Sequence, residues 1–81
     1  MDQLATLAGH QSFVCALQAC TARGMLYSAS CDKTLGVWDL LTYERLHVLS
    51  GHRGGLYSLA VHEGQACTGS LDKTVRVWPA L

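Results

Sequence analysis

Apolar residues fall in short runs along the chain, and turn-forming residues separate one run from the next. Runs that are rich in β-branched and aromatic residues and bounded by such turns are typical of strands. They predict strands at about 14–19, 25–30, 35–38, 43–49, 56–61, 66–70 and 75–78, with a further strand over 4–8. Several runs are apolar on both faces, a pattern that favours sheets covered on both sides. No segment predicts a convincing helix.

The chain contains two copies of one unit. The Gly-His pair at 9–10 aligns with the pair at 51–52 at an offset of 42, and the Asp-Lys-Thr turn at 32–34 aligns with 72–74 at an offset of 40. The offsets differ by two because an intervening turn is longer in the first copy, and turns tolerate changes in length. Self-similarity at a fixed period is the signature of a repeat architecture.

The repeat also decides one ambiguous segment. Residues 14–19 are Ala-rich and, taken alone, could form a helix. Their counterpart at 56–61 lies between glycines and has the composition of a strand. The first copy is therefore expected to form a strand at the same place.

The motif shared by the two copies resembles the WD40 repeat. Each copy has Gly-His, then Ser/Thr-x-Ser-x-Asp-Lys-Thr, then Val-Trp, and the resemblance covers essentially the whole chain. It implies an all-β fold of two four-stranded antiparallel WD40-type blades, an incomplete propeller, with repeats at about 4–40 and 46–81. The sequence departs from the pattern at Pro79, which stands in the place of Asp, and at Lys33 and Lys73, which stand in the place of Gly.

By this resemblance the second blade lacks its outer strand, while residues 4–8 form an outer strand without a blade. Two blades would also leave two apolar faces bare. We therefore expect neighbouring blades. They come either from a longer chain, of which these residues are a fragment or short isoform, or from identical chains that exchange residues 4–8 and close a ring. The remaining alternative is an unstable chain that aggregates through its exposed strand edges.

The resemblance further implies a buried chain of hydrogen bonds in each unit, running from a Trp indole through a Ser or Thr hydroxyl and a His imidazole to an Asp carboxylate. Carried over to this sequence, its members are Trp38, Ser28, His10 and Asp32 in the first unit and Trp78, Thr68, His52 and Asp72 in the second. The expected role is structural, since a buried indole needs an acceptor and a buried carboxylate needs a partner.

A hydroxyl, an imidazole and a carboxylate are also the components of a nucleophilic catalytic triad. Three observations argue against catalysis: the set occurs twice, Ser in one copy is Thr in the other, and no nucleophile elbow or oxyanion loop accompanies it. The other acidic residues are scattered, at Asp2, Asp39, Glu44 and Glu63. We expect no catalytic residue and no enzyme. We also expect no metal site, because neither His47 nor His62 has a partner at ligand spacing.

By the same resemblance, WD40 propellers look like scaffolds that present loop residues on one rim to peptides or other proteins. In this chain the rim follows the Gly-His pairs and precedes the turn Asp residues, and its members are Gln11, Phe13, Cys31, Arg53 and Leu71. Aromatic residues and Arg are enriched at interface hot spots. The expected function is a non-enzymatic scaffold or adaptor for protein–protein interaction. The alternative is a pair of purely structural blades that complete a larger or swapped propeller whose binding face lies elsewhere.

Composition narrows the class of partner. The 81 residues include six Lys or Arg and six Asp or Glu, so the formal net charge is zero and the clustered cations of a nucleic-acid interface are missing. No apolar run approaches the roughly 18–20 residues of a membrane span, and the N-terminus lacks the basic region of a secretory signal. We expect no nucleic acid, membrane or cofactor as a partner. We expect an intracellular chain, with the cytoplasm favoured over the nucleus.

The four cysteines, at positions 15, 20, 31 and 67, have none of the spacings of a zinc site. We expect free thiols that pack as small apolar residues, as is usual for chains without a secretory signal. Cys31, on the hairpin turn before Asp32, is expected to be the thiol most exposed to solvent.

Overall fold

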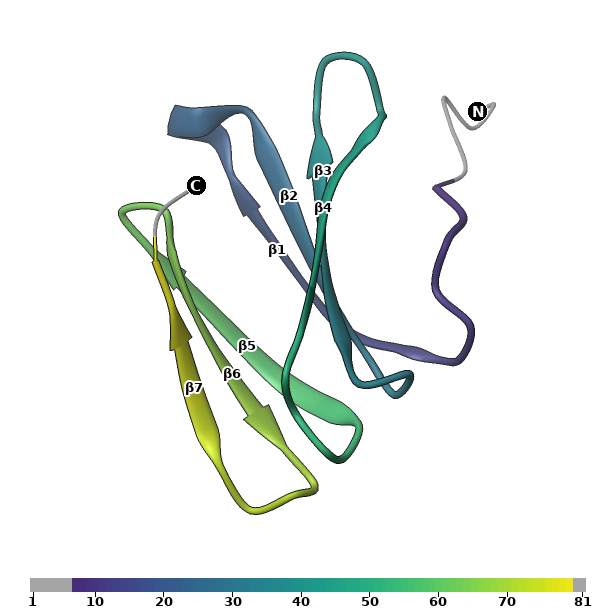
Figure 1. The fold of residues 1–81 in the computed structure, drawn as a ribbon. Helices are drawn as coiled ribbons and strands as arrows, with labels where there is room; N and C mark the ends of the chain where they lie inside the picture. The colour runs from purple at the N-terminus through teal and green to yellow at the C-terminus, as the bar shows by residue number, and fades with distance from the viewer. Residues whose placement is uncertain (1–6, 80–81) are drawn as a thin grey trace.

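The structure, a computed structural model, describes residues 7–79 and consists of two antiparallel sheets (Figure 1). The first sheet has four strands in chain order: β1 (Val14–Cys20), β2 (Met25–Ser30), β3 (Thr34–Asp39) and β4 (Arg45–Ser50). The second has three, also in chain order: β5 (Leu56–His62), β6 (Gln65–Ser70) and β7 (Val75–Trp78). Between β1 and β2 lies a single turn of 3-10 helix, η1 (Thr21–Arg23).

The strands lie where the apolar runs predict them, with ends that differ by one or two residues, so the all-β antiparallel fold is confirmed. The Ala-rich segment at 14–19 is a strand because it pairs with β2 along its length. Of the strand expected over 4–8, residues 4–6 lie outside the described range, and residues 7–8 are not in a strand. Within residues 7–79 the second sheet has three strands rather than four.

The hydrophobic core lies between the two sheets, where β5 packs against β1 and β2. It consists of Met25, Tyr27, Ala29, Leu35, Val37, Leu56 and Ala66. Tyr27 reaches from the first sheet to the second unit, and its hydroxyl donates to the carbonyl of Gly64 at 3.3 Å, which satisfies the buried phenol. A Cβ at Gly55 would lie 3.0 Å from the Cα of Cys31, so a glycine here allows the two units to approach closely.

The lysines that depart from the WD40 pattern lie in the two hairpin turns, in a backbone conformation that favours glycine. Lys33 has φ of 77° and Lys73 has φ of 73°, which places both in the left-handed region that favours glycine. In each turn the lysine N–H donates to a serine carbonyl, from Lys33 to Ser30 at 3.2 Å and from Lys73 to Ser70 at 3.1 Å. The turns therefore hold each lysine in a backbone conformation that glycine adopts with less strain.

Equivalent positions in the two units differ in exposure, because each unit contributes a different face to the interface between the sheets. Val14 is 48% exposed, whereas its equivalent Leu56 is 1% exposed. On the opposite face, Val37 is fully buried and its equivalent Val77 is 64% exposed. One apolar face of each sheet is therefore left uncovered.

We call these two uncovered surfaces the leading face and the trailing face. The leading face belongs to the first sheet and includes an apolar depression lined by Leu7, His10, Val14, Leu17, Leu26, Ser28 and Trp38. The trailing face belongs to the second sheet and exposes Val75 and Val77 of β7.

Candidate functional site

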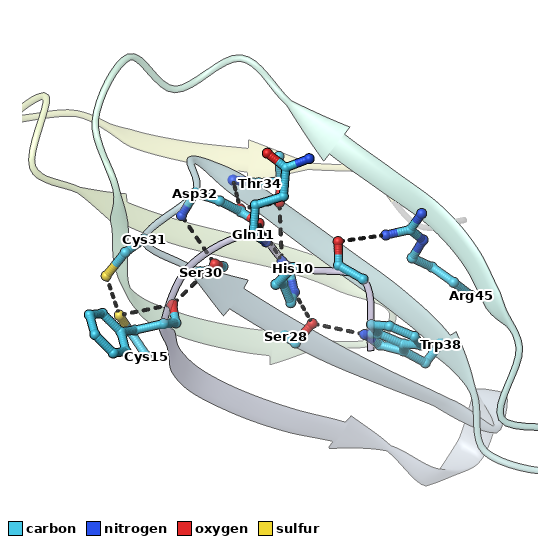
Figure 2. A network of polar contacts seen from close by, with 12 residues as sticks. His10, Gln11, Cys15, Ser28, Ser30, Cys31, Asp32, Thr34, Trp38 and Arg45 are labelled. Carbon is cyan, nitrogen blue, oxygen red and sulfur yellow. Dashed lines mark hydrogen bonds and ion pairs between the residues drawn. The ribbon is translucent and has the colours of Figure 1, made fainter. Parts of the chain in front are cut away.

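The first unit contains one continuous chain of side-chain hydrogen bonds (Figure 2). The indole nitrogen of Trp38 on β3 lies 2.8 Å from the hydroxyl oxygen of Ser28 on β2. Ser28 Oγ lies 2.6 Å from His10 Nε2. His10 Nδ1 lies 3.0 Å from the Oδ2 of Asp32 in the β2–β3 turn. The chain thus ties the loop before β1 to the two central strands of the sheet.

The chemistry of the indole and the carboxylate indicates which group donates in the hydrogen bonds at the two ends of this chain. An indole nitrogen only donates, so the Ser28 oxygen accepts from Trp38 and its own hydrogen is free for His10. A carboxylate only accepts, so the hydrogen of His10 is on Nδ1 and points to Asp32. In the neutral imidazole, Nε2 is then the acceptor for the serine hydroxyl. Donors aligned in one sense polarise one another and end on a negative charge.

The carboxylate of Asp32 collects donors from two segments, the Gly-His loop and the start of β3. Besides His10, it accepts the backbone N–H of Gln11 at 2.9 Å, the backbone N–H of Thr34 at 3.0 Å and the Thr34 hydroxyl. Burial raises the pKa of Asp32, but the hydrogen bonds from Thr34, Gln11 and His10 outweigh it and hold the pKa well below the ordinary value. Asp32 is therefore ionised at neutral pH.

The second unit repeats this geometry with Thr in the place of Ser. Trp78 Nε1 lies 2.9 Å from Thr68 Oγ1, which lies 2.8 Å from His52 Nε2. His52 Nδ1 lies 3.0 Å from Asp72 Oδ2. Hydrogen bonds from the Thr74 hydroxyl and the backbone of the Gly-His loop hold the pKa of Asp72 well below the ordinary value, against the opposing effect of burial. All eight side chains named from the sequence thus lie in two matching sets.

The sequence interpretation missed the two threonines that complete these sets. The hydroxyl of Thr34 bonds to the carboxylate of Asp32 and lies 3.3 Å from His10 Nδ1. Thr74 does the same in the second unit, at 3.2 Å from His52 Nδ1. The signal was available, because a Thr follows the turn Asp by two positions in both copies.

Two arginines hold the Gly-His loops from different strands. Arg45 on β4 donates to the carbonyl of Gly9 at 3.1 Å and lies 6.0 Å from the centre of the Trp38 ring. In the second unit, Arg76 on β7 donates to the carbonyl of Gly51 at 2.9 Å. The positions of these arginines are not equivalent in the repeat, so the alignment of the two copies gave no signal for them.

The five rim residues lie at one end of the two sheets. The backbone N–H groups of Gln11 and Arg53 donate to the turn carboxylates at 2.9 and 2.8 Å, and the side chains of both residues are exposed. Phe13 is 81% exposed and Leu71 is 71% exposed. Cys31 is half-buried.

The prediction that Cys31 is the most exposed thiol is wrong, because Cys15 is exposed and Cys31 is only partly so. The reason is the close approach of the second unit, whose Gly55 packs against the backbone of Cys31. All four cysteines are free thiols.

Across residues 7–79, no group of three or more His, Cys, Asp or Glu side chains could hold a metal ion. The same stretch contains no helix of the length and apolar character that crossing a membrane requires.

Comparison with known proteins agrees with this geometry. A family model described as "WD domain, G-beta repeat" matches residues 1–39 and 43–79. Mitochondrial division protein 1 of Mycosarcoma maydis is 38% identical over 73 residues, which cover 90% of this chain and 9% of that protein. Cell division control protein 4 of Saccharomyces cerevisiae is 35% identical over 80 residues, which cover 96% of this chain and 9% of that protein.

Solved structures show the same relationship. The crystal structure of the computationally designed Ika4 protein superposes with a TM-score of 0.85 at 33% identity, covering 96% of this chain and 48% of that chain. The chain thus spans 9% of the length of each of the two relatives above and about half of the designed protein. Since the family model matches both units, the chain belongs to the WD40 repeat family.

Proposed function

We propose that this chain is a non-enzymatic WD40 module for protein–protein interaction, and that its binding rim consists of Gln11, Phe13, Cys31, Arg53 and Leu71. The observation that carries the proposal is the combination of exposed side chains with a fixed backbone. Phe13 and Leu71 direct large apolar side chains into solvent. The neighbouring loop backbone is held by charge-assisted bonds to Asp32 and Asp72.

A rigid loop lowers the conformational entropy lost on binding. The rim of each unit is anchored twice, once through the turn carboxylate and once through a serine. Ser30 donates to the carbonyl of Phe13 at 3.0 Å, and Ser70 donates to the carbonyl of Gly54 at 2.9 Å. The rim therefore presents an aromatic, an arginine and an aliphatic side chain in a fixed arrangement, a composition suited to an extended peptide or a protein loop.

Panning a display library of random peptides on the immobilised chain tests this proposal. The dissociation constant of each selected peptide is then measured by calorimetry for the wild type, Phe13→Ala and Arg53→Ala. We expect either substitution to weaken binding at least tenfold, which corresponds to about 1.4 kcal/mol, with the melting temperature unchanged.

Leu41→Ala is the matched control, because Leu41 is an exposed apolar residue on the β3–β4 turn, at the opposite end of the sheet. Peptides that bind Leu41→Ala weakly and Phe13→Ala normally would contradict the placement of the rim. A library that yields no peptide would contradict the interaction function itself.

The non-enzymatic part of the proposal is supported by the hydroxyls of the two hydrogen-bond chains. Ser28 is 3% exposed and Thr68 is fully buried. Each oxygen already accepts an indole N–H, which occupies a lone pair that a nucleophilic hydroxyl would need for attack. Free thiols throughout support an intracellular location.

The leading and trailing faces support a second function, in which the two blades complete a larger propeller. The blades next to these two would come from the rest of a longer chain or from identical chains. The supporting observation is that each exposed residue has a buried equivalent in the other unit. Val14 is exposed where Leu56 is buried, and Val77 is exposed where Val37 is buried. Light scattering on the chain after size exclusion tests this, with a defined oligomer expected and a stable monomer as the contradicting outcome.

A further inference from the structure

Two thiols of the first unit touch each other. The sulfurs of Cys15 and Cys31 lie 2.7 Å apart, side by side where β1 begins and the β2–β3 turn starts (Figure 2). A disulfide bond measures about 2.04 Å, so the two atoms need to move together by only about 0.7 Å to reach bonding distance. Both are free thiols, and Cys15 is exposed to solvent.

A β-bulge produces this contact. The register of β1 against β2 passes from Val14 opposite Ser30 directly to Ala16 opposite Ala29, so Cys15 is the extra residue that has no partner. Bulges redirect the side chain of the extra residue. Here the redirected side chain meets the residue that follows the end of β2.

The carbonyl of Phe13 holds both cysteines in place. It accepts the backbone N–H of Cys31 at 2.8 Å and the hydroxyl of Ser30 at 3.0 Å, and the Cys15 sulfur lies 3.7 Å away. Cys31 is held a second time by the packing of Gly55 on its backbone. The two sulfurs are therefore positioned by the main chain and not only by their own contact.

The second unit shows that this position is built by the fold. Its strand β5 has the same bulge, between Leu56 and Ser58, which makes Tyr57 the extra residue. The N–H of Leu71 donates to the carbonyl of Gly55 at 2.9 Å, as Cys31 does to Phe13. Tyr57 and Leu71 are thus the equivalents of Cys15 and Cys31. Only the first unit carries sulfur at both positions.

We propose that Cys15 and Cys31 form a redox-active dithiol, which low-molecular-weight disulfides of the glutathione class convert into an intramolecular disulfide. The Cys15 thiolate attacks one sulfur of the small disulfide, forms a mixed disulfide and releases one small thiolate. Cys31 then loses its proton, attacks Cys15 Sγ and displaces the second small thiolate. The protein loses two electrons and two protons, and the small disulfide becomes two thiols.

The order of attack follows from the environment of the two sulfurs. The hydrogen bond with Cys15, together with burial and the charge of Asp32, raises the pKa of Cys31, so Cys31 is the thiol that keeps its proton more tightly than an ordinary cysteine. Cys15 is the more accessible sulfur and lies within hydrogen-bond distance of Cys31. It is therefore the first nucleophile, and Cys31 is the resolving thiol.

The experiment equilibrates the 81-residue chain in glutathione redox buffers at neutral pH, traps the thiols by alkylation and maps the tryptic peptides by mass spectrometry. Arg23 separates Cys15 from Cys31, but no Lys or Arg separates Cys15 from Cys20. The chain used is therefore Cys20→Ser, in which a link between the peptides at 1–23 and 24–33 identifies the proposed disulfide. The same measurement in concentrated urea gives the reference for the unfolded chain.

We expect the Cys15–Cys31 disulfide to exceed every bond to Cys67 by at least about tenfold in buffer. In urea, where only loop length distinguishes the pairs, we expect the preference to fall to roughly three- to sixfold. Equal preference in buffer and urea would overturn the proposal. So would a mixed glutathione disulfide at Cys15 that persists without forming the bond.

Two further variants separate the roles of the thiols. Cys31→Ser is expected to accumulate the mixed glutathione disulfide at Cys15, because the resolving thiol is gone. Cys67→Ser, a matched removal of a half-buried thiol on β6, is expected to leave the Cys15–Cys31 bond unchanged. A Cys31→Ser chain that resists glutathionylation at Cys15 would contradict the assignment of Cys15 as the nucleophile.

Discussion

Trp38 donates its indole N–H to the hydroxyl of Ser28 at 2.8 Å, and both side chains are buried against the first sheet. The same oxygen lies 2.6 Å from His10 Nε2, so one small side chain serves two buried polar groups. Its loss leaves both groups without a partner, and a buried donor or acceptor that has lost its partner costs about 1–3 kcal/mol.

Ser28→Ala is therefore expected to lower the free energy of unfolding by about 1–3 kcal/mol, measured by urea denaturation followed by Trp fluorescence. Ser28→Thr keeps the hydroxyl and copies Thr68 of the second unit, so it should retain most of the stability. An alanine variant as stable as the wild type would show that the hydrogen-bond chain does not stabilise the fold.

Stability is expected to fall in acid because of Asp32 and Asp72. Both carboxyls have a pKa in the folded chain well below the ordinary value of about 3.9 that they regain on unfolding. The unfolded chain therefore binds protons first, and the stabilisation present above pH of about 4 is lost as the pH falls further. Urea midpoints across an acidic pH series measure this loss.

Asp32→Asn should reduce that acid dependence to the part that Asp72 contributes, while lowering stability at neutral pH. Glu63→Gln is the control, because Glu63 lies on an exposed turn and forms no part of either chain of hydrogen bonds. A wild-type midpoint that stays constant from neutral pH into strong acid would contradict the pKa assignment.

Lys33→Gly is expected to stabilise the chain by about 0.5 kcal/mol. A non-glycine residue in the left-handed region costs roughly 1–2 kcal/mol, and glycine loses roughly 0.5–1 kcal/mol through the entropy of the unfolded chain. The melting temperature should therefore rise by a few degrees. Lys33→Ala, which removes the charge but keeps the strained φ of 77°, should give no such gain. A rise of equal size for alanine would assign the effect to charge.

Leu17→Lys is expected to reduce self-association without unfolding the chain, because Leu17 lies exposed on the leading face. Its equivalent in the second unit, Leu59, packs against the core, so Leu59→Lys should unfold the protein. Light scattering measures association, and circular dichroism measures folding. Unchanged association of the Leu17→Lys variant would show that the leading face is not part of the interface.

The periodic features of this fold could be predicted from the sequence because they occur twice. Within residues 7–79, six of the seven strands and every member of the two hydrogen-bond chains have a counterpart in the other unit, as Trp38 has in Trp78. Single side-chain contacts and strand register could not be predicted. Arg45 acts from β4, which has no counterpart within the described residues, and the bulges at Cys15 and Tyr57 depend on strand register. Register is a property of the pairing and not of either strand alone.

The two uncovered faces have a consequence for assembly. The leading face of one chain would pack against the trailing face of the next, as the two sheets pack within one chain. Every contact between copies would therefore be head-to-tail, and the growing assembly would always expose one leading face and one trailing face at its ends. The pairing of faces by itself sets no limit on the number of copies. The rotation from one sheet to the next alone decides whether the series closes into a finite ring or continues as an open filament.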